Sequence, residues 1–174
     1  GEYSISGTLV GDLSLKRYFT YTGKVITIDR HESKDETPNS TLTTDIALNG
    51  WTQARLQDKG DSYYLQDESC RVVELYLAEE SISLVDTWPA GNGRVLKVEF
   101  FVEWATDVTQ GIPAGTYTVV ARDKESYGIP RELLKPGNIA SGYPNGFTYP
   151  GGTWYEKLQN GAMKEYARID GGTM

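Results

Sequence analysis

Short runs in which apolar and polar side chains alternate dominate the chain. The clearest run lies within Gly93–Trp104, where from Leu96 onward every second position is apolar and most positions between are charged. The apolar positions are Leu96, Val98, Phe100, Val102 and Trp104, and the charged positions are Lys97, Glu99 and Glu103. A period of two is typical of a β-strand with one face on a core and the other in solvent. We therefore expect Lys97 and Glu99 on the solvent face, which Phe101 interrupts.

Similar runs recur along the chain between residues that favour turns. The predicted strands are Glu2–Val10, Arg17–Asp29, Thr43–Gln57, Ser62–Gln66, Cys70–Glu79, Arg94–Trp104, Gly115–Ala121, Thr153–Leu158 and Ala162–Ile169. Helical periodicity is confined to Ile129–Gly137, where Pro130 and Pro136 limit any helix to one or two turns. Because no helices alternate with the strands, we predict an all-β, antiparallel, jelly-roll-like β-sandwich of about nine strands. The alternative is a closed or partly open up-and-down barrel, similar to a lipocalin.

Length and composition favour a single β domain over residues 1–174. Within it we expect an N-terminal hairpin at 2–29, a polar linker at 30–42 and a body at 43–174. The linker is predicted because Asp29–Thr43 is charged, polar and free of aromatic residues. The C-terminal segment ends in a turn at Asp170–Gly172 after which no further strand follows.

The ionisable residues argue against several classes of function. The formal net charge of −7 repels phosphate groups, so we expect no nucleic-acid partner. No stretch is long and apolar enough to span a membrane, and no signal segment opens the sequence. The single cysteine, Cys70, lies in an apolar run and is predicted to be buried. The single histidine, His31, lies in the polar linker, so we predict no metal site, no cofactor and no catalytic triad.

Paired carboxylates leave an enzymatic alternative open, because a glycosidase needs only two acids close together. Such a pair could come from two groups of acids. Glu74, Glu99 and Glu103 lie on predicted strands, and a second group clusters in a turn region, namely Asp58, Asp61, Asp67 and Glu68.

The segment Gly137–Tyr155 is the least ordinary part of the sequence. It sets aromatic rings among glycine and proline residues, and exposed rings of this kind form platforms for sugars or peptides. Together with Trp88, which precedes Pro89 in a turn, the candidate ligand-binding residues are Trp88, Tyr143, Phe147, Tyr149 and Trp154. The alternative is that the loop rings plug one end of the sandwich.

Three motifs carry a resemblance to a known family. They are "GDSYYLQDESCRVVELYL" at Gly60–Leu77, "GIPAGTYTV" at Gly111–Val119 and "GGTWYEK" at Gly151–Lys157. Over residues 56–174 the chain resembles a functionally uncharacterised β-module of secreted surface lipoproteins from gut Bacteroidales. The resemblance implies a location at the outer surface of a bacterium, with any signal segment or lipid anchor outside this chain.

The N-terminal hairpin resembles the closing hairpin of such a module, although it precedes the module body. We expect Glu2–Val10 to pair beside Ala162–Met174, within one chain as in a circular permutation or by exchange between chains. The protein would then be a monomer or a hairpin-exchanged oligomer. A further alternative is that the hairpin belongs to a neighbouring module of a longer protein.

These observations predict a non-enzymatic extracellular module that acts as a spacer or binds a glycan or protein ligand through its loop aromatics. The alternatives are a barrel that encloses a small apolar ligand and a glycosidase-type enzyme with paired carboxylates.

Overall fold

The computed structural model describes residues 2–10, 16–24, 40–60, 70–85, 88–123, 126–143 and 151–174. The chain divides into two compact units, Gly1–Glu36 and Thr37–Met174, and each is described by itself. In the first unit, β1 (Glu2–Val10) pairs antiparallel with β2 (Lys16–Lys24), which confirms the predicted hairpin. The expected pairing of this hairpin with the C-terminal strand stays a prediction, as does the single-domain organisation.

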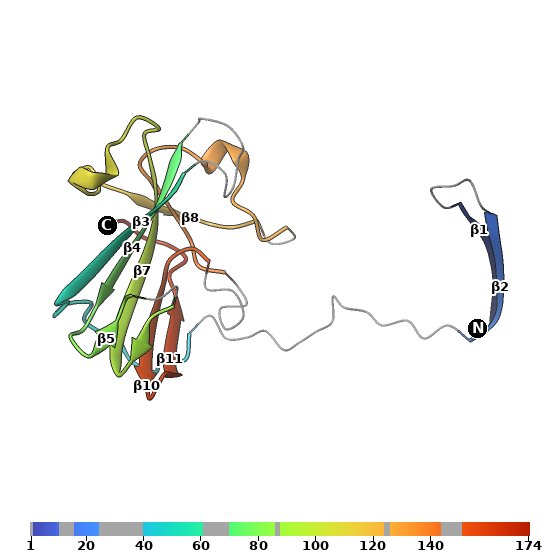
Figure 1. Cartoon of the computed structure of the whole chain (residues 1–174), viewed down its shortest axis with the longest axis horizontal. Coiled ribbons are helices and arrows are strands. Elements are labelled where there is room, and N and C mark those ends of the chain that lie inside the picture. Colours follow the sequence, from blue (N-terminus) through green and yellow to red (C-terminus); the bar gives the residue numbers. More distant parts are fainter. Residues whose placement is uncertain are drawn as a thin grey trace. The chain divides into compact units, whose positions relative to one another are not determined.

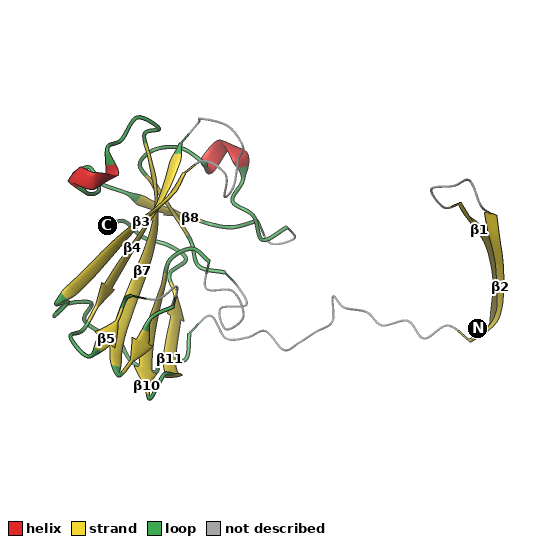
Figure 2. Ribbon diagram, viewed as in Figure 1, coloured by secondary structure: helices red, strands yellow, loops and turns green. Residues whose placement is uncertain are grey.

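The second unit, called the body below, is built on a seven-stranded sheet (Figures 1 and 2). Five strands follow the order β11-β10-β7-β4-β3, and every pairing among them is antiparallel. They are β3 (Gln53–Gly60), β4 (Arg71–Ala78), β7 (Gly93–Val102), β10 (Trp154–Gln159) and β11 (Ala162–Arg168). The short β9 (Asn138–Ala140) joins β7, and β8 (Thr118–Val120) joins β9 in parallel. A two-stranded sheet of β5 (Ile82–Ser83) and β6 (Ala90–Gly91) completes the strands described in the body.

β7 is the centre of the body because three strands pair with it. β4 pairs with β7 from Val95 to Val102. On the other edge, β10 pairs with the first half of β7, and β9 pairs with Phe100 and Phe101 in the second half. The sheet therefore divides beside β7, with β10 and β11 in one branch and β9 and β8 in the other.

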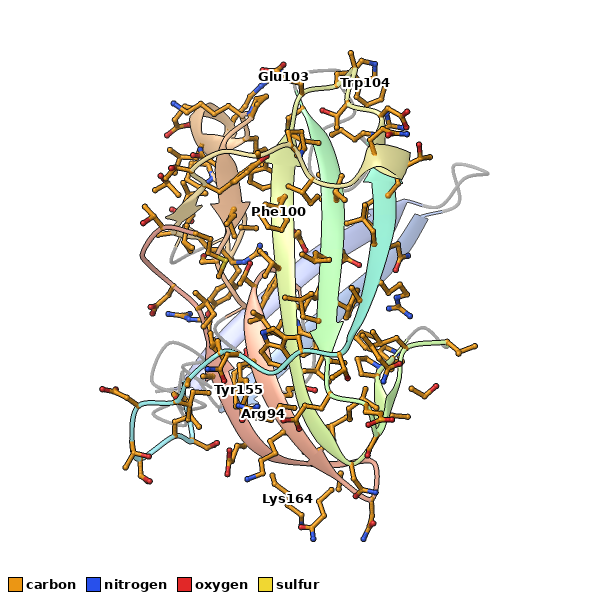
Figure 3. The ribbon with its side chains drawn as sticks, turned by 90° about the vertical axis from the view of Figure 1, so that its left-hand side faces the viewer. Arg94, Phe100, Glu103, Trp104, Tyr155 and Lys164 are labelled. Atoms are coloured by element: carbon orange, nitrogen blue, oxygen red, sulfur yellow. The ribbon has the colours of Figure 1, made fainter. Side chains whose placement is uncertain are left out.

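One face of this sheet, called the apolar face below, packs on the largest hydrophobic cluster of the body. Its buried members are Val73, Leu96, Val98, Phe100, Val102, Tyr117, Val119, Ile139, Tyr155 and Ala167. Phe100 lies in the second half of β7 (Figure 3) and meets the ring of Tyr117 edge to face at a centroid distance of 4.9 Å. The predicted apolar side of Arg94–Trp104 is thus confirmed from Leu96 to Val102, while Trp104 is only half-buried beyond the end of the strand.

The all-β prediction is confirmed, and the only helical segments among the described residues are 3-10 turns at Val108–Gln110 and Arg131–Leu133. The second turn begins after Pro130, as the sequence predicted. The sheet does not close into a barrel, because β3 and β11 are the opposite ends of the strand order. The parallel pairing of β8 with β9 departs from the antiparallel expectation.

Strand boundaries differ from the prediction mainly before β3. Residues 43–52 were predicted as strand, but β3 begins at Gln53. Asn49 and Gly50 are turn-forming residues, and Gly50 has a φ of +81°, which interrupts extended backbone. β5, β6 and β9 have only two or three residues each and were not predicted. The predicted strand Ser62–Gln66 lies outside the described residues.

The residues after β11 pair inside the body. Tyr117 and Met174 exchange two backbone hydrogen bonds of 2.9 Å, and the Val119 N–H donates to the Gly172 carbonyl at 2.9 Å. At the outer edge of β11, the Thr41 N–H donates to the Tyr166 carbonyl at 2.8 Å. The edges of β8 and β11 therefore have backbone partners within the body itself.

Candidate functional site

The second face of the sheet, called the polar face below, buries charged side chains. Lys97 is 3% exposed and Glu99 is fully buried, so the prediction that they lie on a solvent face is wrong. The reason is that Val95 and Phe101 lie on the same side of β7 and pack into two further hydrophobic clusters. One cluster contains Tyr76, Ala78, Ile82, Leu84, Val95, Trp154, Leu158 and Tyr166, and the other contains Cys70, Val72, Phe101, Val120, Ile129, Leu134 and Ala140. The predicted burial of Cys70 is confirmed.

Glu74, Lys97 and Glu99 form a buried charge cluster on this face. The Lys97 Nζ lies 2.6 Å from Glu74 Oε1 and 3.3 Å from Glu99 Oε2. The Tyr76 hydroxyl donates to Glu74 Oε2 at 3.2 Å, and the Gly152 N–H donates to Glu99 Oε2 at 3.0 Å. Each carboxylate therefore accepts a hydrogen bond in addition to its contact with the ammonium group, which buried charges need if they are to remain ionised.

The electrostatic balance of this cluster favours the protonated form of Lys97. Burial alone would lower the pKa of Lys97, but the charges of Glu99 and Glu74 outweigh burial and raise that pKa above its ordinary value. Two carboxylates and one ammonium leave the cluster with a formal charge of −1.

Gly152 allows the chain to approach Glu99 closely. It has a φ of +74°, and a Cβ atom at this position would overlap the Ser141 carbonyl and lie 2.9 Å from the Arg122 guanidinium. Arg122 in turn donates from Nε to the Ser141 carbonyl at 2.9 Å and from Nη1 to the Tyr127 carbonyl at 3.1 Å. Only glycine fits between the charge cluster and this arginine.

A further carboxyl group, Glu156, lies opposite Tyr166 on the neighbouring strand β11. Burial raises the pKa of Glu156 to about 7. Burial also raises the pKa of Tyr166 to about 12, with a smaller contribution from the charge of Glu156. Glu156 can therefore exchange a proton near neutral pH, a property that the sequence pattern did not reveal.

The predicted ligand-binding aromatics do not form one platform among the described residues. Trp88 is 56% exposed, whereas Trp154 is fully buried and meets Tyr76 edge to face at 6.3 Å. Tyr143 is half-buried, with the Arg122 guanidinium 4.2 Å from its ring centroid. Phe147 and Tyr149 lie outside the described residues. A role in ligand binding stays a prediction for all five.

Trp88 belongs to the Trp88 loop, residues 84–89, which joins β5 to β6. The base of this loop is fixed to the sheet, because Arg55 Nη1 donates to the Leu84 carbonyl at 2.6 Å while its guanidinium lies 4.3 Å from the Tyr76 ring centroid. Gln53 Nε2 also donates to the Ile82 carbonyl at 2.8 Å. Val85, 89% exposed, shares the loop with Trp88. Among the described residues between β5 and β6, Val85 and Trp88 thus expose apolar side chains to solvent, and Leu84 is anchored to the sheet.

Other candidate chemistry is limited in the described part of the chain. No group of three or more His, Cys, Asp or Glu residues there could hold a metal ion. Two shallow hollows of about 510 and 520 Å³ are lined by Leu56, Asp58, Val108, Thr109 and Gly111, and by Ser40, Leu42, Thr43, Thr44, Asp45 and Ile46. Neither hollow contains a predicted ligand-binding residue. Across the same described ranges, no helix has the length and apolar character that crossing a membrane requires.

The fold and these features define an all-β protein with an open mixed sheet and a charge cluster inside it. No protein-family model, curated protein or solved structure matches the chain. The resemblance to Bacteroidales surface modules therefore stays a prediction.

Proposed function

We propose that this protein is a non-catalytic extracellular module of a bacterial surface lipoprotein, which binds a glycan through Trp88. The observation that carries the proposal is the exposure of the Trp88 ring on a loop whose base is held by Arg55 and Gln53. A tryptophan ring has few side-chain torsions and so loses little conformational freedom on binding, and its apolar surface suits the C–H face of a sugar. The acidic surface is compatible with an uncharged glycan and disfavours an anionic one.

The alternatives have less support. A barrel that encloses an apolar ligand depends on closure of the sheet, and the strand order is open. A glycosidase needs carboxyl groups that reach the substrate, whereas Glu74 and Glu99 are buried and both contact Lys97. Glu103, the third acid considered for such a pair, is exposed beyond the end of β7 (Figure 3).

The experiment is a titration of the protein with a panel of neutral polysaccharides, followed by calorimetry. We expect at least one glycan to bind, Trp88→Ala to weaken that binding by on the order of tenfold or more, and Trp88→Phe to retain part of it. Leu48→Ala is the matched control, because Leu48 is also an exposed apolar residue but lies outside the loop. Failure of every glycan to bind, or equal binding by Trp88→Ala and the native protein, would overturn the proposal.

A further inference from the structure

The buried charge cluster brings together the groups required for acyl transfer. The Lys97 amine is a nucleophile once it is deprotonated, and its Nζ lies 2.6 Å from an oxygen of the Glu74 carboxyl group. The side chains of Lys97 and Glu74 are 3% and 6% exposed, and that of Glu99 is fully buried. A contact this short between buried groups provides the proximity on which an intramolecular reaction depends.

The neighbours of this pair are placed to assist the reaction. Glu99 Oε2 lies 3.3 Å from Lys97 Nζ and can accept a proton from it, while the Gly152 N–H holds Glu99 in position. The Tyr76 hydroxyl donates to Glu74 Oε2, the oxygen that does not contact the amine at 2.6 Å. A donor at that oxygen stabilises the negative charge that develops when an amine attacks a carboxyl carbon.

We propose that Lys97 and Glu74 condense to form an isopeptide bond that joins β7 to β4, with Glu99 as the proton-transfer group. Glu99 first accepts a proton from the Lys97 ammonium, and the free amine attacks the carboxyl carbon of Glu74. A bond forms between Lys97 Nζ and that carbon, and one of its C–O bonds breaks. The released oxygen leaves as water with two protons that come from the ammonium and pass through Glu99.

The overall change converts one ammonium and one carboxylate into one amide and one water molecule. It requires no oxidant, no cofactor and no second substrate, and Glu99 ends in the ionisation state in which it began. Burial provides the driving force, because two charges kept from water are replaced by a neutral amide. The reaction occurs once per chain, so it is compatible with a protein that has no turnover and is independent of glycan binding.

The test is the intact mass of the folded protein. We expect a mass lower than that of the sequence by one water molecule. In Lys97→Arg, which keeps a cation but lacks the amine, the full mass should remain. In Glu99→Gln, which keeps an acceptor for the Gly152 N–H but lacks the base, condensation should be lost or slowed at least tenfold. Glu74→Gln should lose ammonia in place of water, because an amide then supplies the leaving group.

Peptide mapping locates the bond. Trypsin should fail to cleave after Lys97, so that peptide 72–94, which contains Glu74, stays joined to peptide 95–122. Circular dichroism of each variant shows that it has folded before its mass is interpreted. An unchanged mass in the folded native protein would overturn the proposal, and so would a bond that lies within peptide 95–122, which would join Lys97 to Glu99.

Discussion

The two faces of the central sheet are formed by the same strands but are stabilised by different interactions. On the apolar face, Leu96, Val98 and Phe100 pack in a cluster of hydrophobic side chains, and the removal of apolar surface from water stabilises this packing. On the polar face, Lys97 and Glu99 alternate with Val95 and Phe101, and the buried charges remain stable only because each one has specific partners. The apolar face therefore tolerates changes in proportion to volume, whereas the polar face depends on a complete set of charges.

The largest expected effect on stability comes from a change in the charge cluster of the polar face. Lys97→Met is compared with Lys97→Arg, which keeps a cation but cannot form the isopeptide bond. Lys97→Met removes the only cation of the buried charge cluster and leaves Glu74 and Glu99 buried without their counter-charge. We expect a loss of about 3–5 kcal/mol in the free energy of unfolding at pH 7, measured by urea denaturation.

Two control variants sharpen this prediction. Leu96→Ala on the apolar face should cost about 2–5 kcal/mol through lost burial and the cavity it leaves, with the same cost at every pH. A triple variant, Glu74→Gln with Lys97→Met and Glu99→Gln, removes all charge but keeps acceptors for Tyr76 and Gly152. It should recover most of the stability, and a triple variant as unstable as Lys97→Met would show that size, not charge, determines the effect.

A smaller effect should come from Glu156 on the polar face. Its pKa is raised in the folded protein to about 7, from an ordinary value of 4.5, so the folded state binds the proton more tightly than the unfolded state. This preference stabilises the fold fully below about pH 4.5, and the stabilisation disappears as the pH rises through about 7. Because the side chain is partly exposed, we expect Glu156→Gln to raise the unfolding free energy at pH 8 by only about 1–3 kcal/mol.

The same denaturation series at pH 5 provides the comparison for Glu156. The native protein and Glu156→Gln should converge there, because the native carboxyl group is then protonated when folded. A constant difference between the two proteins from pH 5 to pH 8 would contradict the prediction.

The smallest effect is expected at the surface of the β10–β11 pair. Lys157 and Glu165 form an ion pair of 3.0 Å, but their side chains remain 48% and 34% exposed. Lys157→Ala should therefore lower the unfolding free energy by less than about 1 kcal/mol, and 1 M salt should remove the difference. Thermal melts at low and high salt are sufficient, and a loss comparable to that of Lys97→Met would contradict the contrast between buried and exposed pairs.

The sequence predicts the apolar face well and the polar face badly. Leu96 to Val102 alternate clearly, so their common face could be inferred from period two alone. The burial of Lys97 and Glu99 could not be inferred in this way. Apolar and charged residues alternate in the same pattern whether or not a second layer covers the charged side chains. The available signal was the pair Val95 and Phe101, which makes the run almost continuously apolar and is typical of a strand buried on both faces.

The candidate site shows the same division between local and long-range information. The exposure of Trp88 was favoured by its turn before Pro89, a local feature. The burial of Trp154 depends on Tyr76, which is far away in sequence, so proximity to loop glycines was a poor guide. The raised pKa of Glu156 and the position of Gly152 beside Glu99 likewise depend on contacts that one strand alone does not encode.

The division of the sheet beside β7 also has a consequence for how quickly the body can fold. β3, β4 and β7 all lie within residues 53–102, with only the short β5 and β6 between β4 and β7, so their pairings need only moderate loops to close. β10 pairs with β7 only after the chain has passed through residues 103–153. Closing that longer loop costs more conformational entropy, and this cost comes before the β7–β10 contacts can offset it. Until β10 and β9 arrive, one edge of β7 has no partner and is able to pair with another chain. We therefore expect the arrival of these two strands to be the slow step in folding, and we expect a higher protein concentration during that step to favour aggregation.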